Sequence, residues 1–224
     1  MDSLRLFAVV VGLFSLVTST SAGACYQFNG EGRVVFPQEI TISTSAHFKL
    51  SFRTVADSGI LFYAEGSYHR TDTYDFEGLF MRDGYLHYFL FNPPRNSHGT
   101  SFGFHGKSKK RVNDGQWHQV EFYRNIDTER RKANGTTERV HRTGLKVDGV
   151  LEAFDDRYRS DVQIFPPITL GEDPHLQERS SKSIGNFKGK IQDFEEVEND
   201  IQFGMEEANV AGGASHCIVV PDAV

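Results

Sequence analysis

The chain has 224 residues, 38% of them hydrophobic, and carries 24 basic against 30 acidic side chains, a net charge of −6. A net negative charge argues against general nucleic-acid binding. The length lies within the range of one all-β domain and is ample for a hydrophobic core.

The N-terminal segment has the pattern of a secretory signal peptide. Arg5 precedes an apolar stretch from Leu6 to Val17, and small residues follow as far as Ala24. The stretch is shorter than the roughly 20 apolar residues that span a bilayer as a helix. The pattern therefore predicts export from the cell without membrane insertion.

Two positions fit the small-residue rule for cleavage of this segment, Ala22 and Ala24. Cleavage after Ala22 is preferred, because it leaves Cys25 inside the mature chain. The expected organisation is then a signal peptide over residues 1–22 and one domain over residues 23–224, ending in a short acidic segment.

The two cysteines, Cys25 and Cys217, lie near opposite ends of the mature chain. Two cysteines in an exported protein most simply form one disulfide. A loop of this length gives about 5 kcal/mol of stabilisation in the chain-entropy model, and the bond would make the terminal strands neighbours. A second interpretation stays open, because Ala22–Cys25 loosely resembles a bacterial lipoprotein box. In that case Cys25 would be lipidated and Cys217 unpaired.

Strand-length segments separated by Gly, Asn, Asp and Pro clusters recur along the chain, while helical periodicity is almost absent. This pattern is typical of an all-β sandwich. Phe48, Leu50 and Phe52 alternate with polar residues, which predicts a strand with one buried face. The expected strands and hairpins are 48–54, 58–63, 79–91 with a turn at Asp83-Gly84, 120–123, 145–150, 168–170 and 185–194. The polar, basic stretch 127–143 is predicted to be a loop or the tip of a long hairpin.

Three motifs are specific in combination: Ser58-Gly-Ile-Leu-Phe62, Asp114-Gly-Gln-Trp-His118 and Phe187-x-Gly-x-Ile-x-Asp193. In this order the chain resembles the laminin G-like domain, also called the LNS domain of laminins, neurexins and sex-hormone-binding globulin. The resemblance covers about residues 26–203. It implies an all-β fold, a jelly-roll β-sandwich of two antiparallel sheets, that works as a binding module.

The resemblance also assigns roles to individual residues. Lys190 stands where the family has a cysteine bonded to one near the C-terminus. The only sulfur left for Cys217 is that of Cys25, so the resemblance implies an end-to-end disulfide in place of the usual late one. Trp117 and His118 correspond to core-facing residues of a central strand.

Many domains of this family bind calcium at the rim of the sandwich. By resemblance, the first ligand is Asp75, which opens the Asp-Phe-x-x-Leu strand, and the backbone carbonyl of Asn92 is another. The second acidic ligand is missing from Ile164–Pro167, and the nearest carboxylate is Asp161. Calcium prefers six to eight oxygens, so the sequence leaves calcium open. The alternative is that Asp75 only caps a strand or accepts backbone hydrogen bonds.

Positive charge is concentrated in residues 107–146, which hold 11 basic and 5 acidic side chains, a net charge of +6. Two basic runs supply most of this charge, the first at residues 107–111 and the second at residues 130–132. If the fold brings these runs together, charge-assisted hydrogen bonds to sulfates would make them a heparan sulfate site. The alternative is two solvated loops without a ligand. The glycosylation sequon Asn134-Gly-Thr136 lies beside the second run. The candidate glycan-binding residues are Lys107, Lys109, Lys110, Arg111, Arg130, Arg131 and Lys132.

Catalysis is not expected, because the chain has none of the common nucleophile or metalloprotease motifs. A glycoside hydrolase needs two carboxylates at a fixed separation, and Asp193 and Glu195 lie on one face of an expected strand. Glu196 breaks the alternation, so this stretch is interpreted as a solvated, negatively charged edge that discourages edge pairing. Four histidines are expected at strand ends or in loops: His69, His87, His98 and His105.

These observations predict a secreted, non-catalytic binding or adhesion module of the extracellular space. Its expected partner is a cell-surface or matrix protein, or an anionic glycan such as heparan sulfate. The alternatives are a polysaccharide-active jelly-roll enzyme and a carrier of a small apolar ligand. No cofactor is expected apart from calcium, which stays open.

Overall fold

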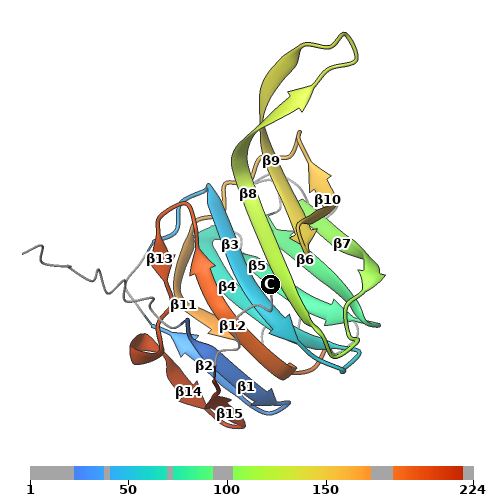
Figure 1. The fold of residues 1–224 in the computed structure, drawn as a ribbon. Helices are drawn as coiled ribbons and strands as arrows, with labels where there is room; N and C mark the ends of the chain where they lie inside the picture. The colour runs from blue at the N-terminus through green and yellow to red at the C-terminus, as the bar shows by residue number, and fades with distance from the viewer. Residues whose placement is uncertain (1–22, 38–40, 70–72, 93–102, 173–183, 219–224) are drawn as a thin grey trace, which may run out of the picture.

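The computed structural model describes residues 23–37, 41–69, 73–92, 103–172 and 184–218. These residues form two antiparallel sheets packed face to face (Figure 1). The expected signal peptide and the last six residues of the acidic C-terminal segment lie outside the described residues. No helix in the described ranges is long and apolar enough to cross a membrane.

The strands of sheet A are β1 (Cys25–Asn29), β3 (Ala46–Arg53), β8 (Trp117–Arg131), β9 (Thr137–Val147), β10 (Val150–Asp155), β12 (Lys188–Glu196), β13 (Ile201–Gln202) and β15 (Ala214–His216). Those of sheet B are β2 (Arg33–Phe36), β4 (Gly59–His69), β5 (Thr73–Arg82), β6 (Tyr85–Phe91), β7 (Gly103–Arg111), β11 (Ile164–Leu170) and β14 (Asn209–Ala211). Sheet A has the order β10-β9-β8-β3-β12-β1-β15, with β13 beside β12. Sheet B has the order β14-β2-β11-β4-β5-β6-β7, and one 3₁₀ turn, η1 (Met205–Glu207), precedes β14.

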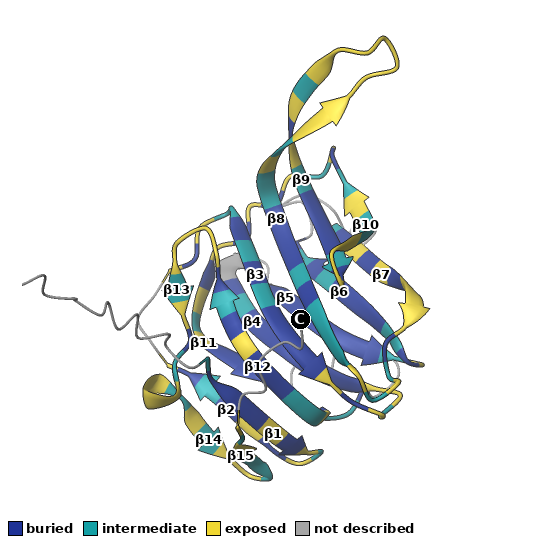
Figure 2. Ribbon diagram, viewed as in Figure 1, coloured by how far each residue is buried: buried dark blue, intermediate teal, exposed yellow. Residues whose placement is uncertain are grey.

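The strands carry their buried residues in the two stacked sheets (Figure 2), and the core between the sheets is rich in phenylalanine. Phe48, Leu50 and Phe52 on β3 are all fully buried, as their alternation predicts. Phe48 stacks on Phe122 of β8 and contacts Phe62 of β4, so aromatic contacts join the two sheets. Burying each such side chain stabilises the fold by roughly 1.5–3 kcal/mol.

The expected hairpin turn at Asp83-Gly84 is confirmed. Asp83 and Gly84 have φ values of 54° and 78°, the left-handed backbone that a tight two-residue turn requires. The turn sets the register of β5 against β6, in which Arg82 lies opposite Tyr85 and Phe80 opposite His87.

The stretch 127–143 is a long hairpin, one of the two structures expected for it. Its ladder runs from Asp127↔His141 to Arg131↔Thr137. The hairpin extends beyond the sandwich as a two-stranded arm (Figure 1). Its tip is exposed on all sides, which explains why polar residues occupy both of its faces.

A disulfide joins Cys25 to Cys217, across 192 positions of sequence. The terminal strands are neighbours, since β1 pairs with β15 through Tyr26↔His216. The end-to-end bond is therefore confirmed, and the alternative with a lipidated Cys25 and an unpaired Cys217 is wrong because both sulfurs are used.

Two other expectations differ from the structure. The interpretation of the Asp193–Glu196 stretch as an edge is wrong, because β12 lies inside sheet A between β3 and β1. Asp193 and Glu195 lie on the outer face of this interior strand, whereas Glu196 is fully buried opposite Phe48. Trp117 lies opposite exposed Arg53 and is half-buried, so it does not face the core as expected. His118 does face it, opposite buried Phe52 with 5.8 Å between ring centroids. Its ring nitrogens also contact two aspartates, Asp114 at 3.1 Å and Asp148 at 2.8 Å.

Candidate functional site

The first basic run lies on β7, the edge strand of sheet B. On the neighbouring β6, Leu86, Tyr88 and Leu90 point into the core, so the alternate residues face outward. These outward residues and the residues that pair with them on β5 and β7 form a surface that we call the β5–β7 face. It consists of Phe80, Arg82, Tyr85, His87, Phe89, His105, Lys107 and Arg111.

Strand register arranges the β5–β7 face in rows, because residues directly opposite in an antiparallel pair share one face. The first row is Arg82, Tyr85 and Arg111. In the second row, His87 lies between Phe80 and Lys107. Two cations therefore flank Tyr85, and a third lies one row away.

Aromatic rings hold these cations. Lys107 Nζ lies 4.0 Å from the centroid of the Tyr85 ring, and the Arg111 guanidinium lies 5.9 Å from it. Among the residues that the structure describes, no ion pair involves Lys107, Lys110 or Arg111. Lys109 differs, since its Nζ donates to the backbone carbonyl of Leu151, 3.1 Å away.

The second basic run lies in the β8–β9 arm, and two of its three cations pair with carboxylates. Arg130 Nε donates to Glu138 at 2.9 Å, and Lys132 Nζ lies 2.7 Å from the same carboxylate. Arg130 also lies 3.6 Å from Asp156. These two positive charges are therefore partly neutralised within the arm, where they share the carboxylate of Glu138.

The structure does not join the two basic runs. Lys109 contacts Leu151 on β10. Leu151 lies opposite Lys146 on β9, and Lys146 lies opposite Glu121 on β8, so the three residues are at the same height in sheet A. The arm carries Arg131 ten residues farther along β8, which is about 30 Å at 3.3 Å per residue. A single concentrated patch of all seven candidate residues is therefore absent.

His87 and His105 form a pair on the β5–β7 face, with 2.8 Å between His87 Nδ1 and His105 Nε2. Both lie inside strands, so their expected placement at strand ends or in loops is wrong. Burial lowers the pKa of His87 to about 4, helped by His105, Lys107 and Arg82 and opposed by Asp83. Burial and the cations Arg82 and Lys107 likewise lower the pKa of His105.

The rim residues expected around calcium do lie together. Asn92 Nδ2 donates to Asp75 at 3.1 Å and to Asp161 at 2.5 Å, so its amide nitrogen bridges the two carboxylates. The Tyr158 hydroxyl donates to Asn92 Oδ1 at 3.1 Å and holds the amide in this orientation. Within the described ranges, no group of three or more His, Cys, Asp or Glu side chains is arranged around a metal position.

A buried charge network links the sheets below the rim. Arg124 on β8 donates to Glu77 on β5 at 2.5 Å, and the Tyr88 hydroxyl donates to the other Glu77 oxygen at 2.5 Å. The side chains of Arg124 and Glu77 are completely buried. Burial raises the pKa of the Glu77 carboxyl, against the lowering effect of Arg124 and Tyr88. This network fixes sheet A to sheet B, and the sequence patterns did not reveal it.

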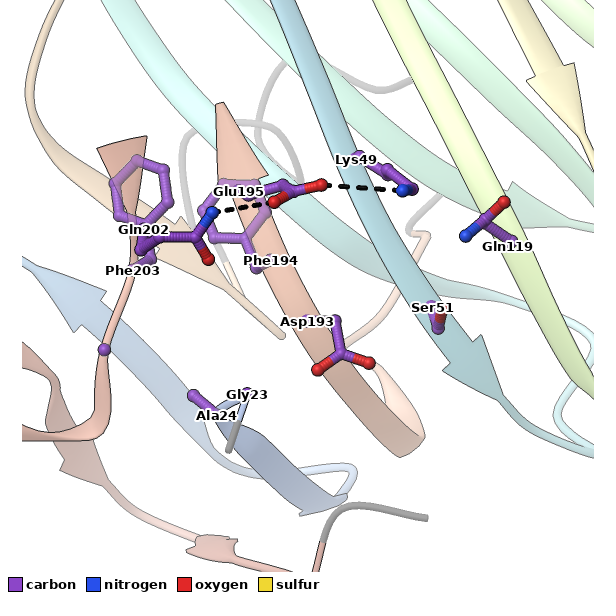
Figure 3. Close-up of a pocket in the computed structure, with 11 residues that line it drawn as sticks. Gly23, Ala24, Lys49, Ser51, Gln119, Asp193, Phe194, Glu195, Gln202 and Phe203 are labelled. Carbon is purple, nitrogen blue, oxygen red and sulfur yellow. Dashed lines mark hydrogen bonds and ion pairs between the residues drawn. The ribbon is translucent and has the colours of Figure 1, made fainter. Parts of the chain in front are cut away.

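A pocket of about 290 Å³ opens on the outer face of sheet A (Figure 3). Asp193 and Glu195 both line it, beside Lys49. Glu195 is already engaged, with Lys49 Nζ at 3.6 Å and an amide hydrogen bond from Gln202 at 2.7 Å. The lining is polar and comes from β3, β8, β12, β13 and the residues just before β1.

The glycosylation sequon lies at the tip of the arm, farthest from the sandwich (Figure 1). Asn134 Oδ1 accepts hydrogen bonds from the backbone nitrogen of Thr136 at 3.1 Å and from its hydroxyl at 2.7 Å. Both residues are exposed. The side chain of Asn134 is thus open to solvent at a distance from the β5–β7 face.

Sequence reasoning missed most of the β5–β7 face, since only Lys107 and Arg111 of its eight residues were candidate binding residues. Arg82, Tyr85, His87 and His105 were not among the candidate binding residues, because none belongs to a basic run. A signal was present nevertheless: residues 85–91 alternate between two sets that are both largely aromatic or apolar. A strand of a sandwich with one solvated face would show polar residues in one of the sets.

The comparisons with known proteins agree with this fold. The family model described as the laminin G domain matches residues 52–196, so the chain belongs to the laminin G domain family. No curated protein sequence matches the chain.

Solved structures give the same result for the fold. Domains LG4-5 of the mouse laminin α1 chain align with 88% of this chain at 20% identity, with a TM-score of 0.61. The LG1-3 region of the laminin α2 chain aligns with 87% of this chain at 19% identity, with a TM-score of 0.52. A heptameric SAP-like pentraxin from Limulus polyphemus aligns with 88% at 13% identity and 0.56, over 95% of its own chain. The alignments cover 47% and 34% of the two laminin fragments.

Proposed function

From membership of the laminin G domain family, we propose that this protein is a secreted, non-catalytic binding module that recognises an anionic glycan of the cell surface or matrix. The observation that carries the proposal is the unequal state of the two basic runs. Lys107 and Arg111 lie over the Tyr85 ring, while Arg130 and Lys132 are paired with Glu138. Of the candidate cations, those on β7 therefore carry most of the charge that has no carboxylate partner among the described residues, whereas Arg131 is the one such cation of the second run.

The chemistry of this face suits sulfate groups. Arginine offers a planar fork of N–H donors and lysine a mobile ammonium, and both bind sulfate through charge-assisted hydrogen bonds. The rigid strands of sheet B hold the cations in place, so little conformational entropy is lost when a ligand orders them. Phe89 and Tyr85 are half-buried, and their rings add apolar contact area beside the charges.

The test is equilibrium binding of the secreted protein to heparin and, as a matched control, to an unsulfated glycosaminoglycan precursor of equal length. We expect binding to heparin that weakens as salt rises, because exposed charges are screened, and much weaker binding to the control. Equal affinity for both polymers, or no binding to either at low salt, contradicts the proposal. Binding of a matrix protein that survives high salt would favour a protein partner instead.

A second candidate function is calcium binding at the rim, favoured by the presence of Asp161 beside Asp75 and Asn92. Two carboxylates fit a calcium ion, but the Asn92 amide now presents its nitrogen to them. Calcium would require the amide to turn its oxygen inward, and the ion would neutralise the two carboxylates. A rise in Tm with millimolar calcium that Asp161→Asn abolishes would support this site, and an unchanged Tm would exclude it.

A further inference from the structure

The histidine pair on the β5–β7 face lies among cations. His87 is in direct contact with His105 at 2.8 Å and stacks on Phe80, with 5.1 Å between ring centroids. The charged groups that act on it are Lys107 from β7, Arg82 from β5 and Asp83 from the turn. Lys107, Arg82 and, when protonated, His105 place positive charge around His87. Against them, the carboxylate of Asp83 raises the pKa of His87.

This environment keeps both imidazoles neutral at physiological pH, because burial and neighbouring cations disfavour the charged form. Phe89 closes the pair on one side, with its ring 5.6 Å from that of His105. His87 is 8% exposed, whereas His105 is exposed. The pair thus consists of one buried and one accessible ring joined by a hydrogen bond.

An anion held by Lys107 and Arg111 would reverse the local field. Protonation of the histidines would then cost less, and by linkage each proton taken up would tighten binding of the anion by the same factor. We propose that the β5–β7 face binds a sulfated glycan more tightly as pH falls, with His105 and His87 as the proton-sensing groups. This inference rests on the glycan binding proposed above, and it adds Arg82 and His105 to the contact surface, with the buried His87 as the hydrogen-bonded partner of His105.

The experiment measures the affinity for a size-defined heparin oligosaccharide at pH 7.5 and pH 5.5 at constant ionic strength. For the wild type we expect affinity to rise by about fivefold or more at the lower pH. His105→Gln should lose most of that rise, so the ratio of its affinities at the two pH values should fall toward one. The matched control is His141→Gln, since His141 pairs with Asp127 at the base of the arm, 2.6 Å away.

The outcomes separate the two proposals. No heparin binding at either pH contradicts the proposed function itself. Binding that is independent of pH, or a pH response that His105→Gln leaves unchanged, overturns the histidine inference alone. A second readout needs no variant: the pKa of His105, followed by NMR of its ring, should increase when heparin is added, and a constant pKa would contradict the coupling.

An independent observation concerns the start of the mature chain. A side chain on Gly23 would place its Cβ 1.8 Å from Asp193 Oδ1, so Asp193 lies against Gly23. The Gly23 nitrogen is therefore within about 5 Å of this carboxylate by bond lengths alone. Figure 3 shows both residues in the pocket on the outer face of sheet A.

The next residues are part of the fold. Ala24 is buried at 7% exposure, and its carbonyl accepts a hydrogen bond from the Asp193 nitrogen at 3.0 Å. Asp193 adopts φ 55° at a bulge, where β12 slips against β3. Cleavage after Ala24 would remove this contact, whereas cleavage after Ala22 preserves it.

We propose that the mature chain begins at Gly23 and that its new α-ammonium forms an ion pair with Asp193. Glycine leaves room there for the carboxylate oxygen, which a side chain would displace. The pair anchors the N-terminus beside β12. This inference rests on secretion as proposed above.

Intact mass of the secreted protein locates the first residue, and the pH dependence of α-amine acetylation gives the pKa of the amine. We expect a start at Gly23 and an α-amine pKa that falls by about half a unit or more in Asp193→Asn. Asparagine tolerates positive φ, so this variant keeps the bulge, and Glu195→Gln in the same pocket is the control. A chain that starts at Cys25, or an α-amine pKa equal in the wild type and Asp193→Asn, overturns the inference. A protein that is not secreted contradicts the proposed function instead.

Discussion

The two basic runs look equivalent in the sequence but differ in the folded molecule. On β7, Lys107 and Arg111 lie over an aromatic ring on a rigid sheet. In the β8–β9 arm, Arg130 and Lys132 are bound to Glu138 from the facing strand. The number of cations is therefore a poor guide to binding capacity, because cross-strand carboxylates decide which charges remain available to a ligand.

The comparison depends on a sandwich that holds both regions in place. Arg124 links β8, which continues into the arm, to Glu77 of the sheet that carries β7. We expect Arg124→Met to lower the free energy of unfolding by about 3–5 kcal/mol, because it leaves Glu77 buried without a counter-charge. Urea denaturation measures this change. The double variant Arg124→Met/Glu77→Leu should recover much of the loss, and no recovery would show that the ion pair is not the cause.

Acid should lower the free energy of unfolding through the β5–β7 face, because this face contains the buried His87. The pKa of His87 is about 4 in the folded protein, below its ordinary value near 6.5. The unfolded chain therefore binds the proton more tightly, so the contribution of His87 to stability is complete above pH 6.5. It is lost as pH falls toward 4, by on the order of 2 kcal/mol. Denaturation across this pH range should show the loss.

The variant His87→Phe sharpens this test, since phenylalanine keeps the stacking on Phe80 and cannot be protonated. Its stability should fall less steeply than that of the wild type between pH 6.5 and 4. Parallel curves for the two proteins would mean that His87 does not carry the effect.

One substitution should make the cations of the arm available to an anion, as those of β7 are. Glu138→Gln removes the carboxylate that pairs with Arg130 and Lys132. Freed from this partner, each cation can contribute up to about 1 kcal/mol to the binding of an anion, so heparin affinity should rise about two- to fivefold. Glu152→Gln, which lies beside Lys109 of β7, is the control for general loss of negative charge. An unchanged affinity in Glu138→Gln would indicate that the arm lies outside the glycan path.

The smallest effect is expected at the sequon. Thr136→Ala should remove a glycan from Asn134, seen as a loss of mass in the secreted protein, and change heparin affinity less than about twofold. The reason is the distance between the tip and β7, about 30 Å along the strands. A large gain in affinity would mean that the glycan shields the binding surface.

The sequence predicted the fold well, because its information is local or carried by family motifs. Alternation in β3, the Asp83-Gly84 turn and the pairing of Cys25 with Cys217 all reappear in the structure. The site was harder to predict. The row of Arg82, Tyr85 and Arg111 depends on the register of three strands, and a bulge between Tyr85 and His87 sets the register of β7.

Pairing partners explain the remaining errors. Whether Arg130 is available depends on Glu138 across the arm, and no pattern within one strand reveals it. The rim is similar: Asp161 precedes β11 by three residues and reaches Asp75 only through the bridging amide of Asn92. Residues that were far apart in sequence became neighbours through tertiary packing, which single-sequence patterns do not encode.

The most direct test of the account compares two triple variants on a heparin column. One changes Lys107, Lys110 and Arg111 to serine, and the other changes Arg130, Arg131 and Lys132 to serine. Both lose three positive charges, so a response to net charge alone would be equal. We expect the β7 variant to elute at clearly lower salt than the wild type and the arm variant to elute close to it. Equal shifts for both variants, or a larger shift for the arm variant, would contradict the assignment of the binding surface to the β5–β7 face.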